Sequence, residues 1–448
     1  MALITHRAAS LSAHGAAVSA GENHRSEQPI TQSSSAASDL PVSTGRFDEI
    51  TREQLNRPSS RKWSLHPETV GAWVAEMDFG TAPEITRRLH QAVDDGHFGY
   101  LSPAIVEEMA RATSGWNRRE YEWDVPWERV HPVADVMTAF ELAVTKFSPS
   151  GTGVIVPTPA YMPFLSVVPS LGREVFEVPG AIDNGRWHHD LAAIDAAFRA
   201  GARTLVLCNP HNPTGTALTR EELEAIATIV ESHHGRVFAD EVHSPLFYGR
   251  QRHIPYASVS DVAAGHTITA TSASKAWNLP GLKTAQLITS NEADEELFDA
   301  FGFAAMQGAS SLGVVAATVA YTEGRPWLNE VVDYLDGNRR TLQALLARHL
   351  PQIRYSLPDA TYIAWLDCSA LEIEGSVADF FRTEAGVTLT DGALCGRGFD
   401  RYIRLVFAMP RPLLEDAVVS MAQAVERDSA RRHHLADSSS NPGGGPSA

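Results

Sequence analysis

Three short polar segments of this chain each follow directly on an apolar run. Residues 209–215 (NPHNPTG) follow TLVLC, residues 240–243 (DEVH) follow RVFA, and residues 272–275 (SASK) follow HTITAT. Short apolar runs bounded by turn residues predict buried strands. A lysine after a strand is usually solvated, and an Asn-Pro-Thr-Gly segment is usually a turn. All three segments lie just beyond strand ends, which is where open α/β sheets bind ligands. This shared position predicts a ligand-binding site.

With Lys283 eight positions after Lys275, these motifs resemble the class I/II aminotransferase superfamily of fold-type I pyridoxal-phosphate (PLP) enzymes. The resemblance covers about residues 46–428. Within the superfamily the chain is similar to the cystathionine β-lyase group called MalY/PatB. The segments that carry this similarity are WVAEMDFG at 73–80, GYLSP at 99–103, PAYMPF at 159–164, SASKAWNLPGLK at 272–283, PWLNEVVDYLDGNR at 326–339 and GVTLTDGALCGRGF at 386–399.

The resemblance implies which residues serve the cofactor ring. PLP stabilises a carbanion at the substrate Cα by drawing electrons into its pyridinium ring. Asp240 is expected to keep the ring nitrogen protonated, as a buried carboxylate would, and Lys275 to bind the cofactor covalently and then act as the base at Cα. Asn212 is expected at the phenolic oxygen and Tyr161 on the ring face, both also near the substrate. His243 replaces a tyrosine common in aminotransferases, and either contacts that oxygen directly or supports it from behind.

The resemblance also implies a phosphate site. Ser272 and Lys283 match the phosphate ligands of the family, although many relatives carry arginine where Lys283 stands. The backbone amides of Ala134 and Asp135 open a helix and should meet the phosphate. The carboxylate of Asp135 suits a dianion only if it turns away as a helix cap. Tyr100 resembles the tyrosine that reaches the phosphate of a neighbouring subunit, which implies a homodimer.

Arg404, in YIRLVFAMP, matches the arginine that grips the α-carboxylate of the substrate, a bidentate task for a guanidinium group. Residues 73–79 should close over the substrate as a gate, with Glu76 where relatives usually carry aspartate. Cys395 is expected to be a small buried residue, because PLP chemistry needs no thiol nucleophile.

The expected reaction is β-elimination of a thiol from an L-cysteine S-conjugate, giving pyruvate and ammonia, with L-homocysteine released from L-cystathionine. This is the activity of a PLP-dependent carbon–sulfur lyase. An aminotransferase of a bulky amino acid uses the same residues and remains an alternative, since subgroup resemblance is associational. A more distant alternative is a non-catalytic sensor that keeps the fold.

The elements that must position these residues alternate between strand and helix. Helical spacing recurs from Val136 to Phe147 and from Leu328 to Leu335. This alternation predicts a largely parallel sheet covered on both faces, and the resemblance adds a PLP-dependent transferase-like α/β fold with a mostly parallel, seven-stranded-type sheet and a smaller α+β domain. The predicted parts are a disordered tail (1–44), a small-domain segment with the gate (45–90), a large PLP-binding domain (91–325), a C-terminal small domain (326–428) and a disordered tail (429–448).

Composition narrows the class of protein. The chain has 448 residues, 44 % hydrophobic and 20 % charged, which fits a globular protein of more than one core. Its net charge of −17 argues against a nucleic-acid or anionic-membrane partner. Three separated cysteines without a CxxC pair favour a reduced cytoplasm, and no Cys/His spacing indicates a metal. The expected partner is therefore a small amino-acid substrate.

Overall fold

The computed structural model describes residues 47–183 and 185–439. The predicted N-terminal tail (1–44) and the last nine residues lie outside this described part. No helix within it is long and apolar enough to cross a membrane.

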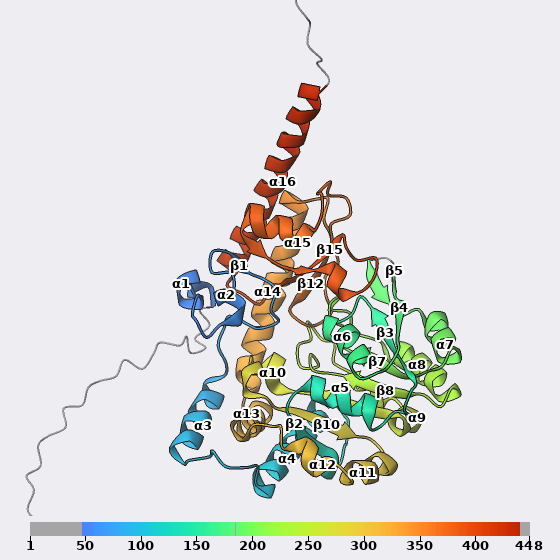
Figure 1. The fold of residues 1–448 in the computed structure, drawn as a ribbon. Coiled ribbons are helices and arrows are strands. Elements are labelled where there is room, and N and C mark those ends of the chain that lie inside the picture. Colours follow the sequence, from blue (N-terminus) through green and yellow to red (C-terminus); the bar gives the residue numbers. More distant parts are fainter. Residues whose placement is uncertain (1–46, 184, 440–448) are drawn as a thin grey trace, which may run out of the picture. The chain divides into compact units, whose positions relative to one another are not determined.

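A seven-stranded sheet forms the centre of the larger part of the molecule (Figure 1). Its strands are β2 (Val130–Val133), β3 (Gly153–Thr158), β4 (Val175–Pro179), β7 (Ala202–Cys208), β8 (Arg236–Asp240), β9 (Thr267–Thr271) and β10 (Ala285–Thr289). The order is β2-β10-β9-β8-β7-β3-β4, and only β10 runs antiparallel to its neighbours. The three strands predicted from apolar runs, β7, β8 and β9, and the mostly parallel sheet are confirmed.

Both faces of this sheet are buried, which explains why its strands are rich in apolar residues on both faces. Along β3, Val154 and Val156 pack into one core cluster with helices α5 (Val136–Thr145) and α6 (Met162–Ser170). Ile155, between them, points to the other face. There it packs with α7 (Leu191–Arg199) and α8 (Arg220–Ser232).

Further elements surround the sheet and complete the larger part. Helix α13 packs against α4 and α3, and its central residues are all buried. These elements are α3 (Pro83–Asp94), α4 (Pro103–Tyr121), α9 (Asp261–Gly265), α10 (Ala273–Ala276), α11 (Glu292–Asp299), α12 (Gly302–Met306), α13 (Ser311–Thr322) and the hairpin β5 (Ala181–Asp183) and β6 (Arg186–His188). Short 3₁₀ turns lie at Trp127–Arg129, Tyr256–Ser258 and Pro280–Leu282.

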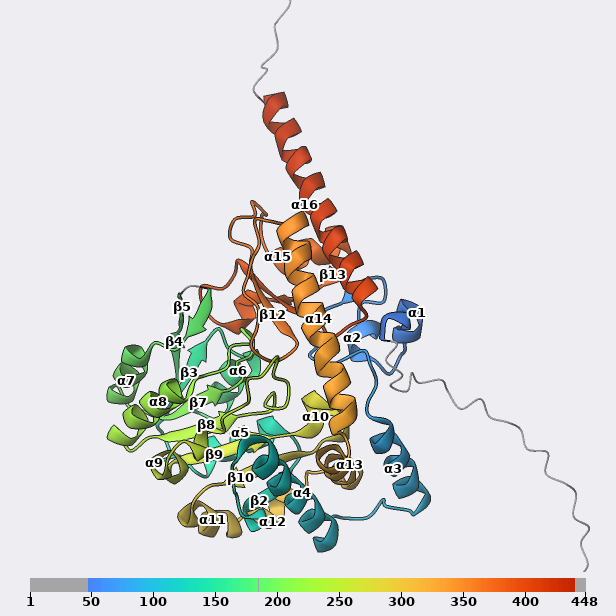
Figure 2. The same cartoon turned by 180° about the vertical axis from the view of Figure 1, so that it is seen from behind.

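The C-terminal region builds a second, four-stranded antiparallel sheet in the order β11-β12-β15-β14. Its elements are α14 (Arg325–His349), β11 (Arg354–Tyr355), β12 (Ile363–Asp367), α15 (Val377–Phe380), a π-helical turn (Phe381–Ala385), β13 (Val387–Thr388), β14 (Thr390–Asp391), a 3₁₀ turn (Gly392–Cys395), β15 (Tyr402–Val406) and α16 (Arg411–Ser439). Figure 2 shows α14 running alongside α16 at this end of the molecule.

The N-terminal segment joins this C-terminal region. It contains a 3₁₀ turn (Phe47–Glu49), α1 (Arg52–Leu55), α2 (Arg61–Ser64) and β1 (Val70–Gly71). Strand β1 pairs in parallel with β13, so residues more than three hundred positions apart are neighbours. Phe47 packs against Phe79 and Tyr334 at ring-centroid distances of 4.7 and 5.1 Å.

The structure differs from the sequence-based expectation at the C-terminus. The sequence predicts a disordered tail from about residue 429, but α16 continues to Ser439. Arg431 and Arg432 stabilise this extension, because both form ion pairs with Asp428 on the preceding turn. Each also reaches across to a glutamate, Arg431 to Glu384 at 3.0 Å and Arg432 to Glu372 at 2.8 Å.

Candidate active site

A cavity of about 600 Å³ opens beyond the carboxyl ends of β7, β8 and β9, where the sequence predicts the site. The start of α5, residues 73–75 of the predicted gate, and β14 and β15 of the second sheet complete its walls. Ten of the eleven predicted site residues line it: Lys275, Asp240, Asn212, His243, Tyr161, Ser272, Lys283, Ala134, Asp135 and Arg404. Tyr100 does not line the cavity of its own chain.

Lys275 lies on the one-turn helix α10, which Ser272 caps at its N-terminus. Its Nζ donates a hydrogen bond to the carbonyl of Ala75 in the gate, at 3.0 Å. Burial, reinforced by the positive charge of Arg404, lowers the pKa of Lys275 to about 8. About a tenth of the amine is therefore neutral at pH 7, far more than at an ordinary lysine, and the neutral form is the one a base or nucleophile requires.

Asp240 ends strand β8 and is buried. One carboxylate oxygen accepts from the amide of Val242 at 3.2 Å, and the Cys208 thiol points at the other from 3.7 Å. Burial raises the pKa of Asp240 to about 6. A protonated ring nitrogen beside this carboxylate would supply the countercharge that its surroundings lack.

His243 follows one turn later and is also buried, with no hydrogen-bond partner for Nδ1 among the residues described. Burial lowers the pKa of His243 to about 3, and the charges of Lys275 and Arg404 add to this effect. The imidazole is therefore neutral, and it can donate or accept a hydrogen bond at the cavity wall.

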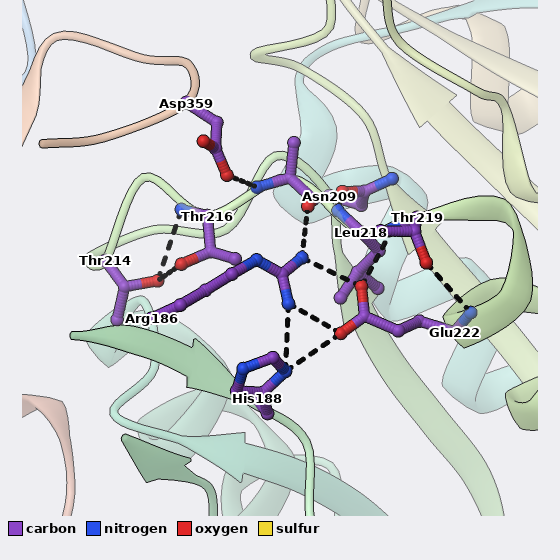
Figure 3. A network of polar contacts seen from close by, with 10 residues as sticks. Arg186, His188, Asn209, Thr214, Thr216, Leu218, Thr219, Glu222 and Asp359 are labelled. Atoms are coloured by element: carbon purple, nitrogen blue, oxygen red, sulfur yellow. Dashed lines mark hydrogen bonds and ion pairs between the residues drawn. The ribbon is translucent and has the colours of Figure 1, made fainter. Parts of the chain in front are cut away.

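The loop that carries Asn212 is held at its ends by a network of polar contacts around Arg186 and Glu222 (Figure 3). Asn209 accepts from the amide of Leu218 at 3.0 Å. Further on, Arg186 forms a bidentate pair with Glu222, at 2.7 and 2.8 Å, and Glu222 also caps α8. From the second sheet region, Asp359 accepts from the amide of Ala217 at 3.1 Å. These contacts fix both ends of the loop and so the position of Asn212.

Arg404 projects from β15 into the cavity and is 4 % exposed. Its guanidinium donates to Asn212 Oδ1 at 3.1 Å, to the carbonyl of Trp73 at 2.9 Å and to Thr390 Oγ1 at 3.3 Å. Its Nε is buried without a partner in the described part of the chain. A planar group with two oxygens, such as a carboxylate, would satisfy these donors.

The start of α5 has the geometry of an anion site. Asp135 is the N-cap and accepts from the amide of Thr138 at 2.8 Å, which meets the condition that its carboxylate turns away as a cap. Its second oxygen accepts from Lys283 Nζ at 2.6 Å. Burial works to raise the pKa of Asp135, but the hydrogen bonds from Lys283 and Thr138 outweigh it and leave this pKa below its usual value. Lys283 is thus close to the free amides at the helix start.

Ser272, Tyr100 and Cys395 have different surroundings. The hydroxyl of Ser272 donates to the carbonyl of Thr284 at 2.7 Å while it lines the cavity. Tyr100 is 92 % exposed, so it is not a core residue and is free to contact another molecule. Cys395 is buried, as expected, and burial raises the pKa of its thiol to about 11, which keeps it protonated and unreactive.

Sequence reasoning missed several residues that shape the site. Asn278 fixes the gate by accepting from the amide of Met77 at 2.9 Å and donating to its carbonyl, and Tyr362 donates to the carbonyl of Ala75. Thr390 binds Arg404, and Arg61 lines the cavity mouth. Of these residues, the sequence pointed only to Asn278, which lies three positions after Lys275.

The cavity fits a cationic aromatic ring that bears a phosphate. Among the described residues Asp240 forms no ion pair, and the Nδ1 of His243 has no hydrogen-bond partner. The lysine amine lies within the same cavity, and a basic side chain and helix amides lie at one end of it. These are the groups that PLP requires.

Comparison with known proteins places the chain in a family. The family model for aminotransferase class I and II matches residues 74–421. The chain is 36 % identical over 381 residues to cystathionine beta-lyase of Corynebacterium glutamicum, covering 85 % of this chain and 100 % of that one. It is 32 % identical to cystathionine beta-lyase PatB of Bacillus subtilis, covering 83 % and 97 %.

Solved structures agree. Cystalysin of Treponema denticola, whose crystal structure contains a pyridoxal 5′-phosphate cofactor, superposes with a TM-score of 0.79 at 27 % identity. The match covers 84 % of this chain and 98 % of cystalysin. The resemblance seen in the sequence is thereby confirmed, and the chain belongs to the class I and II aminotransferase family, in its cystathionine β-lyase group.

Proposed function

We propose that this protein is a PLP-dependent carbon–sulfur lyase that eliminates a thiol from L-cysteine S-conjugates. With L-cystathionine the thiol product is L-homocysteine, and the eliminated three-carbon enamine is released and hydrolysed by water to pyruvate and ammonia. The observation that carries this proposal is the match, over nearly the full length of the relatives, to proteins named cystathionine beta-lyase. The cavity that holds Lys275, Asp240 and Arg404 together supports it.

The residues of this chain divide the reaction between them. Arg404 and Asn212, joined at 3.1 Å, bind and orient the α-carboxylate of the substrate. When bound, PLP draws into its ring the electrons released at the substrate Cα. The neutral amine of Lys275 takes the Cα proton, for which its lowered pKa suits it. The Cβ–S bond then breaks, and its electron pair leaves with sulfur as a thiolate.

The cofactor contacts are part of the same proposal. Asp240 pairs with the ring nitrogen, Asn212 and His243 lie toward the phenolic oxygen, and Tyr161 covers one ring face. The phosphate is bound by Ser272, by Lys283 and by the amides of Ala134 and Asp135 at the start of α5. This assignment is supported by the arrangement of these residues around one cavity.

We also propose that the enzyme is a cytoplasmic homodimer. The nearly complete exposure of Tyr100 supports a role in which its hydroxyl reaches the phosphate bound by the neighbouring subunit. Phe98, two residues earlier, is 71 % exposed and would be covered by the same contact. Three free buried cysteines are in keeping with a reducing compartment.

One assay tests the lyase against its alternatives. PLP-loaded protein is mixed with L-cystathionine without any keto acid, and pyruvate is followed with lactate dehydrogenase. Steady pyruvate release, lost in Lys275→Ala together with the visible absorbance of lysine-bound PLP, is expected. Turnover only after a keto acid is added would instead identify an aminotransferase. Bound PLP without turnover of either kind would indicate a sensor.

A further inference from the structure

Arg61 is a second arginine at the active-site cavity. It is the first residue of α2 and lines the same cavity as Lys275 and Arg404. Unlike the buried Arg404, Arg61 is exposed and stands at the mouth. It forms no ion pair or side-chain hydrogen bond with any other residue of the described part, and its contact is with the ring of Trp73, 5.9 Å from the guanidinium carbon.

No acidic side chain at the cavity is available to neutralise Arg61. Two carboxyl groups of the described residues line the cavity, and neither pairs with Arg61. Asp135 caps α5 and binds Lys283, and Asp240 is buried at the end of β8. Glu76 of the gate acts on Lys275 but does not line the cavity, so Arg61 presents to an entering ligand a positive charge that has no ion-pair partner among the described residues. A guanidinium in this position favours an anionic ligand group, above all a carboxylate.

Trp73 sets the spacing between the two arginines. Its backbone carbonyl accepts from Arg404 at 2.9 Å, and its indole ring lies under Arg61. The indole is itself fixed, because its Nε1 donates to the carbonyl of Lys62 at 3.1 Å. Both guanidinium groups therefore contact the same residue, Arg404 through the backbone carbonyl of Trp73 and Arg61 through its ring.

The remaining wall of the cavity is largely apolar. Val74, Met137, Met162 and Leu394 line it, and Leu394 is 58 % exposed. Such a surface suits the methylene groups and sulfur of a thioether rather than a second polar group. A thioether chain held by its α-carboxylate at Arg404 would cross this surface toward Arg61.

Resting on the lyase function proposed above, we propose that Arg61 determines specificity by binding a carboxylate on the leaving-thiol side of the S-conjugate. The two carboxylates of L-cystathionine are joined by about seven bonds, roughly 8–9 Å when extended. One carboxylate is held by Arg404 and the distal one by Arg61. Conjugates whose thiol carries a distal carboxylate are preferred over neutral ones of equal length.

The test compares conjugates that differ in one group. S-(3-carboxypropyl)-L-cysteine is L-cystathionine without its distal amine, S-(3-aminopropyl)-L-cysteine is L-cystathionine without its distal carboxylate, and S-propyl-L-cysteine carries neither. Pyruvate release by the PLP-loaded enzyme gives kcat/KM for each. Arg61→Met should lower kcat/KM for the carboxypropyl conjugate about three- to fivefold, the range of an exposed charge pair. It should leave the propyl conjugate unchanged and should not impair the aminopropyl conjugate.

Two controls sharpen the result. Arg61→Lys keeps the charge and should retain part of the preference, and added salt should weaken the preference in the wild type. Arg348→Met removes an exposed arginine of α14 that does not line the cavity, and should change no ratio between conjugates.

Several outcomes would overturn the proposal. An equal loss on the carboxypropyl and propyl conjugates would mean that Arg61 acts through packing alone. No loss on the carboxypropyl conjugate, while the wild type turns over both, would refute the role of Arg61 and leave the lyase function standing. A wild type that releases pyruvate from none of the conjugates would refute the lyase function, and this proposal with it.

Discussion

Replacing Lys62 by methionine should destabilise the protein, because it breaks a buried ion pair from one side. Lys62 is 1 % exposed, and its Nζ lies 2.8 Å from Asp78 Oδ2. The same Nζ donates to the carbonyls of Glu76 and Ala408, and Trp63 Nε1 donates to the other oxygen of Asp78 at 2.8 Å. In the variant the Asp78 carboxylate loses its ion-pair partner, and the Trp63 indole is its remaining side-chain hydrogen-bond donor.

The size of the effect follows from general values. Removing one partner of a buried pair costs about 3–5 kcal/mol. Unfolding of roughly 390 ordered residues, at about 2.1 cal/mol/K each, carries an entropy of about 0.8 kcal/mol/K. The melting temperature of the PLP-loaded enzyme at pH 8 should therefore fall by about 4–6 °C.

The loss should depend on pH. Burial already raises the pKa of Asp78 above its usual value, against the opposing effect of Lys62 and Trp63. Without Lys62 this folded-state pKa rises further above the unfolded one. Such a group stabilises the fold below its unfolded pKa, and that stability is lost as pH rises toward the folded pKa. The deficit of Lys62→Met relative to wild type should therefore be smaller at about pH 5 than at pH 8.

Melting followed by circular dichroism at both pH values measures this deficit. Lys146→Met, the same change at an exposed lysine, should shift the melting temperature by less than about 1 °C. Adding Asp78→Asn to Lys62→Met removes the stranded charge and should restore part of the stability. This account of the pair would be refuted if Lys62→Met melted at the wild-type temperature, or if its loss of melting temperature were equal at both pH values. It would also be refuted if adding Asp78→Asn restored none of that loss.

Two further substitutions test the site itself. Arg404→Gln should lower kcat/KM by roughly ten- to a hundredfold, the value of one charged hydrogen-bonded contact. The absorbance of lysine-bound PLP should remain. Its loss would contradict a role of Arg404 confined to substrate binding. Glu222→Gln weakens the pair with Arg186 by about 1 kcal/mol, and through the loop it should raise KM a few-fold with little change in kcat. An unchanged KM would show that Asn212 does not depend on this contact.

The sheet and most of the site could be predicted from the sequence for one physical reason. Strands buried on both faces are rich in apolar residues, so a cluster of polar residues tends to mark where they end. Asp240 follows RVFA in this way, and Asn209 follows TLVLC. Parallel pairing of β7, β8 and β9 then brings these ends to one edge without further information.

What could not be predicted depends on contacts between distant segments. Nothing local marks Lys62 as buried, because its carboxylate partner lies sixteen residues on and its backbone partner Ala408 far beyond. Arg61 precedes it on the same short helix and points instead to the cavity mouth. A lysine and an arginine side by side give no indication of which one is buried.

The pairing of β1 with β13 has a consequence for the order in which the protein matures. Val70 leaves the ribosome about 300 residues before its partner Val387, and at about 5–20 residues per second that interval is roughly 15–60 s. During this time the gate segment has its contacts with Asn278 and Lys275 but lacks those with the C-terminal region, including the bond from the Asp78 amide to the carbonyl of Ala408. The large sheet can form before the gate makes its C-terminal contacts. Cofactor binding in the complete site therefore comes late in synthesis. A ribosome that stalls before residue 387 leaves a chain with a finished sheet and an open site.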